Sequence, residues 1–155
     1  MKPRQISKVL SNNDIGGTGS HQAGICIPKK TDILSFFPVL EKQIKNPREA
    51  MVFIDRTGVI WEFNFIYYNN KFFGGTRNEY RLTGMIPFIK TNKLKAGDVV
   101  MLAHLEDGSY HIDYERNVMH NNDRGVDTEE KSSGHRIVIK SYSWRAINYK
   151  RSNTI

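Results

Sequence analysis

Apolar and polar residues alternate along several short stretches of this chain, the pattern of half-buried β-strands. Strands are predicted at residues 5–10, 25–27, 51–55, 59–63, 64–68, 99–105 and 110–114. The turn Arg56-Thr57-Gly58 joins two of them and indicates a hairpin. Residues 136–147 also alternate, with Ile137, Ile139 and Tyr142 as candidate inward residues.

Helical signals are few and short. Thr31 or Asp32 can cap a helix that ends at Phe37, because Pro38 follows. Residues 82–89 are apolar enough for a core element, and residues 90–96 are predicted as a short helix or turn. Many short strands with one or two helices predict a mainly β fold with short helices, a barrel or sandwich with helical plugs.

Polar, glycine-containing stretches interrupt this pattern in three places. Residues 11–24 hold four glycines among Asn, Asp, Ser and Thr, and residues 69–80 centre on Gly74-Gly75. Residues 116–134 are also polar and are predicted to form a mobile loop. The first two stretches each end at a predicted strand or core element.

The length of 155 residues corresponds to a single domain over residues 1–155. Cys26 is the only cysteine, which excludes a disulfide framework and a thiolate-rich zinc site. No apolar run approaches the roughly 20 residues that cross a bilayer, and Met1–Gln5 lead into no signal-peptide core. We therefore expect a reduced, intracellular protein with no membrane partner.

The formal charge of +7 is concentrated in two segments. Residues 1–31 contain five basic residues and one acid, and residues 71–95 contain six basic residues and one acid. The rest of the chain has a net charge of −2. If the two segments meet in the fold, they form a surface that attracts phosphates; otherwise they are ordinary solvated side chains.

Catalytic motifs are weak in this sequence. Cys26 lies in an apolar tripeptide and is expected to pack as a small hydrophobe. The five histidines lack the spacing of a common zinc site, and the Gly16–Gly19 loop lacks the Lys-Ser/Thr of a phosphate-binding loop. One enzymatic alternative stays open, a compact Mg²⁺-dependent nuclease that uses Asp123 or Asp127 with Glu129 and Lys131.

The segment 77–81 carries a pattern suited to reading DNA. In an extended chain, Arg77, Glu79 and Arg81 point to one side. Arg can donate to guanine O6 and N7, and Glu can accept from cytosine N4, while Asn78 and Gln22 suit adenine. A ladder of surface ion pairs explains the triplet equally well.

A third possibility is a single-stranded RNA binder. Tyr67, Tyr68, Phe72 and Phe73 could stack unpaired bases. Aromatic residues in such positions more often belong to the core or support a loop.

Three motifs resemble a known family. Residues 11–29 read Ser-Asn-Asn-Asp-Ile-Gly-Gly-Thr-Gly-Ser-His-Gln-Ala-Gly-Ile-Cys-Ile-Pro-Lys, which resembles the opening of the N-terminal effector-binding domain of EcoRII-like restriction endonucleases. Asn-Glu-Tyr-Arg-Leu-Thr at residues 78–83 looks like a second signature of that domain. Residues 92–100 are similar to the Leu-Lys-x-Gly-Asp stretch of plant B-three transcription-factor domains.

The resemblance implies a B-three-like DNA-binding pseudobarrel whose two arms, residues 11–30 and 69–81, enter the major groove of double-stranded DNA. For EcoRII-like enzymes the implied target is 5′-CCWGG. Cleavage would reside in a separate PD-(D/E)xK nuclease domain of a prokaryotic cytoplasmic enzyme. This chain would then be a recognition domain without catalysis, needing no cofactor for binding and Mg²⁺ only if a nuclease domain is attached.

The site residues follow from the arms, with no catalytic and no metal-binding residue among them. The base-reading candidates are His21, Gln22, Arg77, Asn78, Glu79 and Arg81. The candidates for contacts with the DNA backbone are Lys8, Ser11, Asn12, Thr18, Ser20, Lys29, Lys30, Lys71, Tyr80, Lys93 and Lys95.

Overall fold

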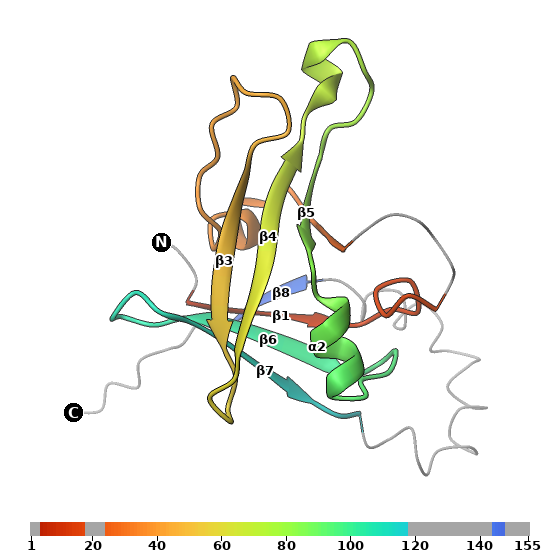
Figure 1. Cartoon of the computed structure of the whole chain (residues 1–155), viewed down its shortest axis with the longest axis vertical. Coiled ribbons are helices and arrows are strands. Elements are labelled where there is room, and N and C mark those ends of the chain that lie inside the picture. Colours follow the sequence, from red (N-terminus) through yellow and green to blue (C-terminus); the bar gives the residue numbers. More distant parts are fainter. Residues whose placement is uncertain (1–3, 18–23, 118–143, 148–155) are drawn as a thin grey trace.

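The computed structural model describes residues 4–17, 24–117 and 144–147 (Figure 1). Its strands form one sheet in the order β2-β5-β4-β3-β7-β6-β1-β8. The strands are β1 (Gln5–Val9), β2 (Ile25–Ile27), β3 (Arg48–Ile54), β4 (Ile60–Tyr68), β5 (Glu79–Thr83), β6 (Val99–His104), β7 (Tyr110–Glu115) and β8 (Trp144–Ile147). The helices are α1 (Thr31–Leu34), α2 (Ile86–Thr91) and the 3-10 helix η1 (Asn70–Phe73).

The sheet has two halves that meet at one short seam. All strand pairs are antiparallel except β3 and β7, which pair in parallel only at Phe53↔Tyr110 and Ile54↔His111. Beyond this seam β3 and β4 run across β1, β6 and β7 (Figure 1). At the other edge, Trp144 Nε1 of β8 donates to the Cys26 carbonyl of β2 over 2.9 Å. This link nearly closes the sheet into a barrel, so the predicted mainly β barrel with short helices is confirmed.

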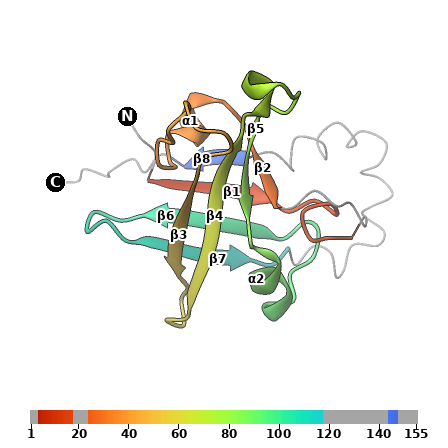
Figure 2. The same ribbon diagram turned by 45° about the horizontal axis from the view of Figure 1, so that its top comes forward.

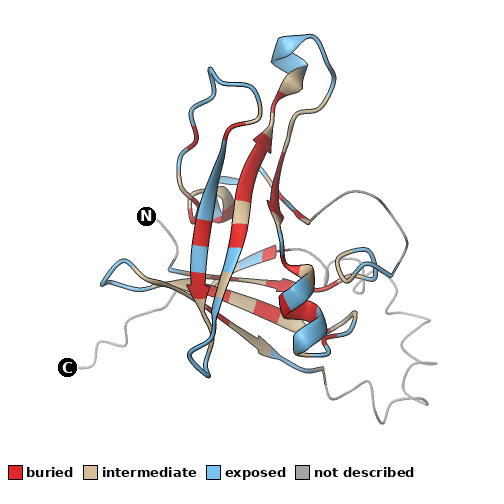
Figure 3. Cartoon of the chain, in the orientation of Figure 1, coloured by how far each residue is buried: buried red, intermediate tan, exposed pale blue. Residues whose placement is uncertain are grey.

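Aromatic side chains fill the barrel. Phe53, Phe63 and Phe65 are fully buried, and Phe88 of α2 packs edge-on against Trp61 at a ring distance of 5.2 Å. Figure 3 shows buried residues at intervals along the strands and within α2. The two α-helices therefore act as plugs, because each inserts apolar residues where the sheet leaves the core open.

Several predicted boundaries change in the structure. Residues 59–63 and 64–68 were predicted as separate strands but form the single strand β4, because the inward alternation through Phe63, Phe65 and Tyr67 continues without a break. Residues 82–89 divide into the end of β5 and the start of α2, with Gly84 at φ 90° between them. The predictions for residues 118–143, which include most of the proposed mobile loop, lie outside the described residues.

Candidate nucleic-acid interface

The pairing of β2 with β5 brings the two polar segments of the sequence together. The register places Cys26 opposite Arg81, and Figure 2 shows the two strands side by side. Arg81 Nη2 donates to the carbonyl of Gly24, 57 positions earlier, over 3.0 Å. The two strands are antiparallel, so the first polar segment enters β2 at Gly24 beside the end of β5, and the second enters β5 at Glu79 beside the end of β2. The two segments therefore flank the same pair of strands at the edge of the sheet.

Gly24 is a backbone requirement of this junction. Its φ is +80°, and a Cβ on this residue would lie 2.3 Å from the carbonyl oxygen of Leu82. Only glycine adopts this conformation cheaply and also permits so close an approach. The tight junction leaves the Gly24 carbonyl aimed at the Arg81 guanidinium.

The Glu79 and Arg81 side chains of β5 lie together with that of Arg77, which precedes the strand, as the alternation predicted. Arg77 Nη2 lies 2.5 Å from Glu79 Oε2, and Arg81 Nη1 lies 3.4 Å from Glu79 Oε1. The ladder of ion pairs, which was the alternative to base reading for this triplet, is therefore present. A ladder and a reading face are compatible, since the Arg77 and Glu79 side chains keep 40% and 29% of their surface exposed.

Arg81 differs from its neighbours in burial. Only 5% of its side-chain surface is exposed, and its guanidinium donates to Glu79 and to the Gly24 carbonyl. A buried guanidinium requires such partners, because an unpaired buried charge is strongly destabilising. In this structure Arg81 ties the base of one arm to the other, and base reading by Arg81 stays a prediction.

The second arm, residues 69–81, is held by its own side chains. Asn70 Oδ1 accepts from the Arg77 amide at 2.7 Å, and the Tyr67 hydroxyl donates to Asn78 Oδ1 at 2.6 Å. The Arg77 guanidinium lies over the Tyr68 ring, 3.9 Å from its centroid. These contacts position Arg77 before any ligand binds.

The first arm, residues 11–30, begins with a small closed turn. The Ser11 amide donates to Asp14 Oδ2 at 2.9 Å, and the Asp14 amide donates to Ser11 Oγ at 3.1 Å. Asp14 also pairs with Lys8 at 2.8 Å, with about 9% or less of either side chain exposed. The proposed readers His21 and Gln22 and the proposed backbone contacts Thr18 and Ser20 lie outside the described residues.

Two predicted contacts with the DNA backbone require correction. Lys8 is buried, because β1 turns it to the same side as Ile6 and Asp14 folds back onto its ammonium. Tyr80 is also buried, stacked on Tyr67 and Phe65 at ring distances of 4.2 and 5.6 Å. Burial raises the pKa of the Tyr80 hydroxyl. Neither side chain presents a surface for phosphates in this structure.

The other described candidates for backbone contacts are accessible. Ser11 is half-buried, and the exposed candidates are Asn12, Lys29, Lys30, Lys71, Lys93 and Lys95. Lys29 and Lys30 directly follow β2, and Lys71 lies in η1 of the second arm. The cations of both arms therefore remain available to a ligand.

The expectation that Cys26 packs as a small hydrophobe is wrong. Ile25 and Ile27 point into the core, which turns Cys26 outward beside Arg81. Partial burial of the thiol nevertheless raises its pKa, against the opposing effect of the Arg81 charge. A raised pKa disfavours the thiolate, which is the nucleophilic form of cysteine.

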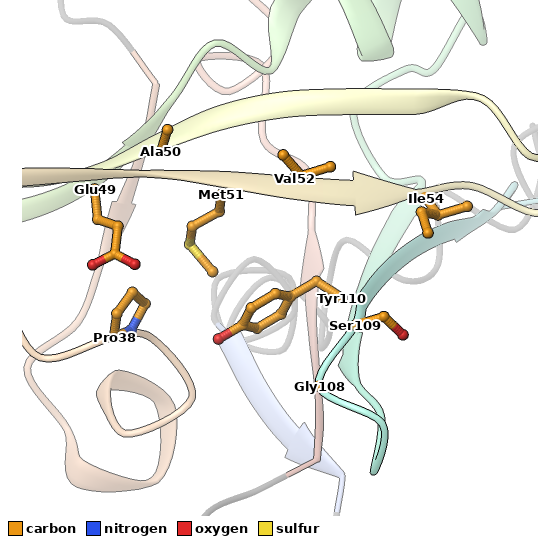
Figure 4. A pocket seen from close by; sticks show the side chains of 9 residues that line it. All are labelled: Pro38, Glu49, Ala50, Met51, Val52, Ile54, Gly108, Ser109 and Tyr110. Atoms are coloured by element: carbon orange, nitrogen blue, oxygen red, sulfur yellow. The ribbon is translucent and has the colours of Figure 1, made fainter.

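The described residues offer little else for chemistry. They contain no group of three or more His, Cys, Asp or Glu side chains that could hold a metal ion. A hollow of about 340 Å³ lies along β3, lined mainly by apolar groups such as Met51 and Tyr110 with Glu49 at one end (Figure 4). Of the helices in the described ranges, none has the length and apolar character to span a bilayer.

Sequence reasoning missed the residues that hold the arms in place. Asp14 fixes the first arm, Asn70 fixes the second, and Trp144 links the edge strands. A signal existed for Asp14, because Ser11-x-x-Asp14 has the reciprocal spacing of a capping box. The other two residues depend on partners that local sequence does not reveal.

Comparison with solved structures defines the class of fold. The chain is similar to the Arabidopsis FUS3–DNA complex, with a TM-score of 0.55 and 25% identity over 71% of this chain and 94% of that one. It is also similar to the B3 domain of the UbaLAI restriction endonuclease with cognate DNA, with a TM-score of 0.53 and 21% identity over 92% of this chain and 86% of that one. The fold is that of the B3 DNA-binding pseudobarrels.

The sequence comparisons identify the family. The family model "Restriction endonuclease EcoRII, N-terminal" matches residues 4–141, so the chain belongs to this family. The type II restriction enzyme EcoRII of Escherichia coli is 36% identical over 104 residues, which cover 62% of this chain and 24% of that enzyme. Auxin response factor 8 of rice is 29% identical over 115 residues, 74% of this chain and 15% of that protein. The chain thus spans a minor part of the length of these relatives.

Proposed function

We propose that this chain is the sequence-specific DNA-recognition domain of a type II restriction endonuclease. It binds a short G·C-rich duplex sequence, with 5′-CCWGG as the first candidate, through two arms in the major groove. The observation that carries this proposal is the β2–β5 pairing, which joins Gly24 of the first arm to Arg81 of the second. Membership of the EcoRII family and similarity to two proteins solved with DNA support it.

The arms divide the work of recognition. Arg77 and Glu79 supply donors and acceptors that match the edges of G·C pairs, and Arg77 is positioned in advance by Tyr68 and Asn70. In the first arm, His21 and Gln22 are proposed to read bases. The backbone contacts fall to the exposed or partly exposed residues Ser11, Asn12, Lys29, Lys30, Lys71, Lys93 and Lys95.

Binding requires no metal in this proposal. Phosphate contacts from lysine supply much of the affinity through counterion release, and base contacts supply the selectivity. Cleavage is assigned to a separate PD-(D/E)xK domain of the parent enzyme, which alone would require Mg²⁺.

A selection from randomised duplexes, read by gel shift in the presence of EDTA, tests the proposal. We expect enrichment of one short sequence rich in G·C pairs. Binding to all duplexes with equal affinity, or to none, would contradict sequence-specific recognition. Plasmid DNA with Mg²⁺ serves as the parallel control, since cleavage that Glu129→Ala abolishes would favour the compact nuclease instead.

A further inference from the structure

Two phenylalanines are exposed at the tip of the second arm. Phe72 and Phe73 belong to η1, and 63% and 43% of their surfaces are accessible. The tip lies beyond the end of β4 at one extreme of the molecule (Figure 1), and most of it is exposed (Figure 3). Phe72 therefore does not belong to the core, whereas Tyr67 of β4, just before the arm, is buried.

The tip is built to hold this apolar surface in place. The Lys71 amide donates to the Arg77 carbonyl at 2.9 Å, and the Gly75 amide donates to the Asn70 carbonyl at 2.7 Å. A Cβ on Gly75 would lie 2.8 Å from Asn70 Cγ, so the turn closes against the Asn70 side chain. A rigid apolar group loses little entropy on binding, which favours a role in recognition.

The residues around the tip are basic, which favours a negatively charged partner. Residues 63–78 contain no acidic residue and include Lys71 and Arg77, of which Arg77 is paired with Glu79 and Lys71 lies next to Phe72. Lys71 Nζ lies 5.8 Å from the centroid of the Phe72 ring. The surface therefore combines an apolar ring with adjacent positive charge. A DNA major groove offers the matching combination, because thymine C5-methyl groups lie between anionic phosphate rows.

The spacing along the arm indicates where such a contact falls. Arg77 and Arg81 are four residues apart on an extended segment, so their positions along the backbone are about 13 Å apart. This distance corresponds to about four base steps of a duplex at about 3.4 Å per step. Because η1 lies beyond Arg77, the tip reaches bases at one end of the sequence that the arms span.

We propose that Phe72, with Phe73 beside it, is a specificity-determining contact to a thymine C5-methyl group in the base pairs that flank the G·C-rich bases read by the arms. This inference rests on the proposed function and adds a thymine preference that Arg and Glu side chains on β5 do not supply. Van der Waals contact with the methyl group excludes water from both surfaces and makes no hydrogen bond.

Replacing single thymines by deoxyuridine in the selected duplex tests this contact, because deoxyuridine lacks only the methyl group. At one position we expect about fourfold weaker binding by the wild-type protein, the value for burying one methyl-sized group. Phe72→Ala should bind the two duplexes equally. Ile60→Ala is the matched control, since Ile60 is 64% exposed but begins β4 at the end remote from the tip. Urea unfolding of both variants establishes that they are folded.

The outcomes separate this inference from the proposed function. If the wild-type protein selects no duplex, the proposed function fails. If it selects a duplex but every deoxyuridine affects wild-type and Phe72→Ala equally, or no thymine is selected, only the methyl contact is wrong. A Phe72→Ala variant that keeps full affinity for DNA but loses self-association in sedimentation would assign the tip to a second copy of the chain. Preferred binding of the unpaired strand would assign it to base stacking.

Discussion

Three basic side chains near the interface differ mainly in how far water reaches them. Lys8 and Arg81 expose 8% and 5% of their side chains, whereas Arg77 exposes 40%. A buried charge contributes through its partners, and removing one partner is costly because the other remains buried. An exposed charge contributes little to stability, which leaves it available for binding.

Alanine at Arg77 and at Arg81 should therefore have different consequences. We expect Arg77→Ala to weaken binding of the selected duplex by about 1–3 kcal/mol and to relax discrimination at one base pair. Arg81→Ala should in addition destabilise the fold by about 1–3 kcal/mol, because Glu79 and the Gly24 carbonyl lose a buried partner. Urea unfolding and gel shifts of the two variants measure both effects. Equal loss of affinity for random and selected DNA in Arg77→Ala would contradict base reading by this residue.

Replacing the buried Lys8 and the exposed Lys29 tests in the same way which of these lysines contacts DNA phosphates. Lys8→Met leaves Asp14 without its cation and should destabilise the protein by about 3 kcal/mol. The slope of log K against log salt should stay unchanged, because Lys8 faces the protein interior. Lys29→Ala should lower that slope by about 1 while stability changes by less than about 0.5 kcal/mol. A smaller slope for Lys8→Met would restore Lys8 as a phosphate contact.

Local pattern predicted which residues share a face, but it did not predict their burial. The alternation of Arg77, Glu79 and Arg81 follows from strand geometry alone. Burial of Arg81 depends on Gly24, and burial of Lys8 depends on Asp14 folding back after β1. The outward position of Cys26 likewise depends on how β2 lies against β5. The burial of these side chains depends on contacts between segments far apart in the chain, which the local pattern of one sequence does not reveal.

At the scale of elements, the junction between β2 and β5 decides whether the arms converge. Gly24→Ala should strain this junction, since the added Cβ would lie 2.3 Å from the Leu82 carbonyl oxygen. Gly58→Ala is the control, because Gly58 has a similar φ of +90° with no atom within 4 Å of the added Cβ. We expect Gly58→Ala to cost about 1–2 kcal/mol from backbone strain alone, and Gly24→Ala to cost more and to weaken DNA binding. Urea unfolding and gel shifts compare the variants. Equal losses in the two would show that the close packing at Gly24 has no consequence.

The β3–β4 hairpin is stabilised by a carboxylate that accepts several hydrogen bonds. The Trp61 indole, the Thr57 hydroxyl and nearby amides lower the pKa of Asp55 from 3.8 to about 2. Because the folded pKa lies below the unfolded one, this stabilisation is complete above about pH 4 and is lost as the pH falls toward 2. The expected size is about 1 kcal/mol, since Asp55 is not deeply buried.

Urea unfolding of the wild-type protein and Asp55→Asn between pH 7 and pH 2 tests this assignment. The difference in free energy of unfolding should shrink as the pH falls below about 4, because protonated Asp55 resembles the amide. A constant difference over this range would show that the ionised carboxylate does not stabilise the hairpin.

The elements themselves were largely predictable, and their long-range pairing was not. All eight described strands overlap segments predicted as strands, alternating stretches or core elements, although β5 does so only at Leu82 and Thr83. The helix bounds were predicted less well, because α1 ends at Leu34 and not at Phe37, and α2 covers residues 86–91 and not 90–96. The prediction of two strands in place of β4 was wrong. The polar Asn64 lies between the inward-facing Phe63 and Phe65, and in the sequence it resembles the end of a strand. The short parallel seam between β3 and β7 and the Trp144 link have no signal in the local pattern.

At the scale of the whole molecule, the fold turns an uneven charge distribution into one candidate surface. Two positively charged segments are separated by some forty residues of mixed charge. The nearly closed sheet brings the two arms, which carry five of the eleven basic residues of these segments, to the β2–β5 edge. The polar hairpin turns at residues 55–58 and 105–109 lie elsewhere on the barrel, at the ends of β3 and β6. One duplex could therefore contact both arms while these turns stay free.

A titration of ¹⁵N-labelled protein with the selected duplex, followed by amide chemical shifts, tests the convergence of the two arms most directly. The account predicts saturable shift changes at Gly24, Lys29 and Lys30 of the first arm together with Lys71, Arg77 and Glu79 of the second, at one stoichiometry. The amides of Gly58 and Gly108 in the two hairpin turns should stay unchanged. Shift changes confined to one arm, or centred on those turns, would contradict the account.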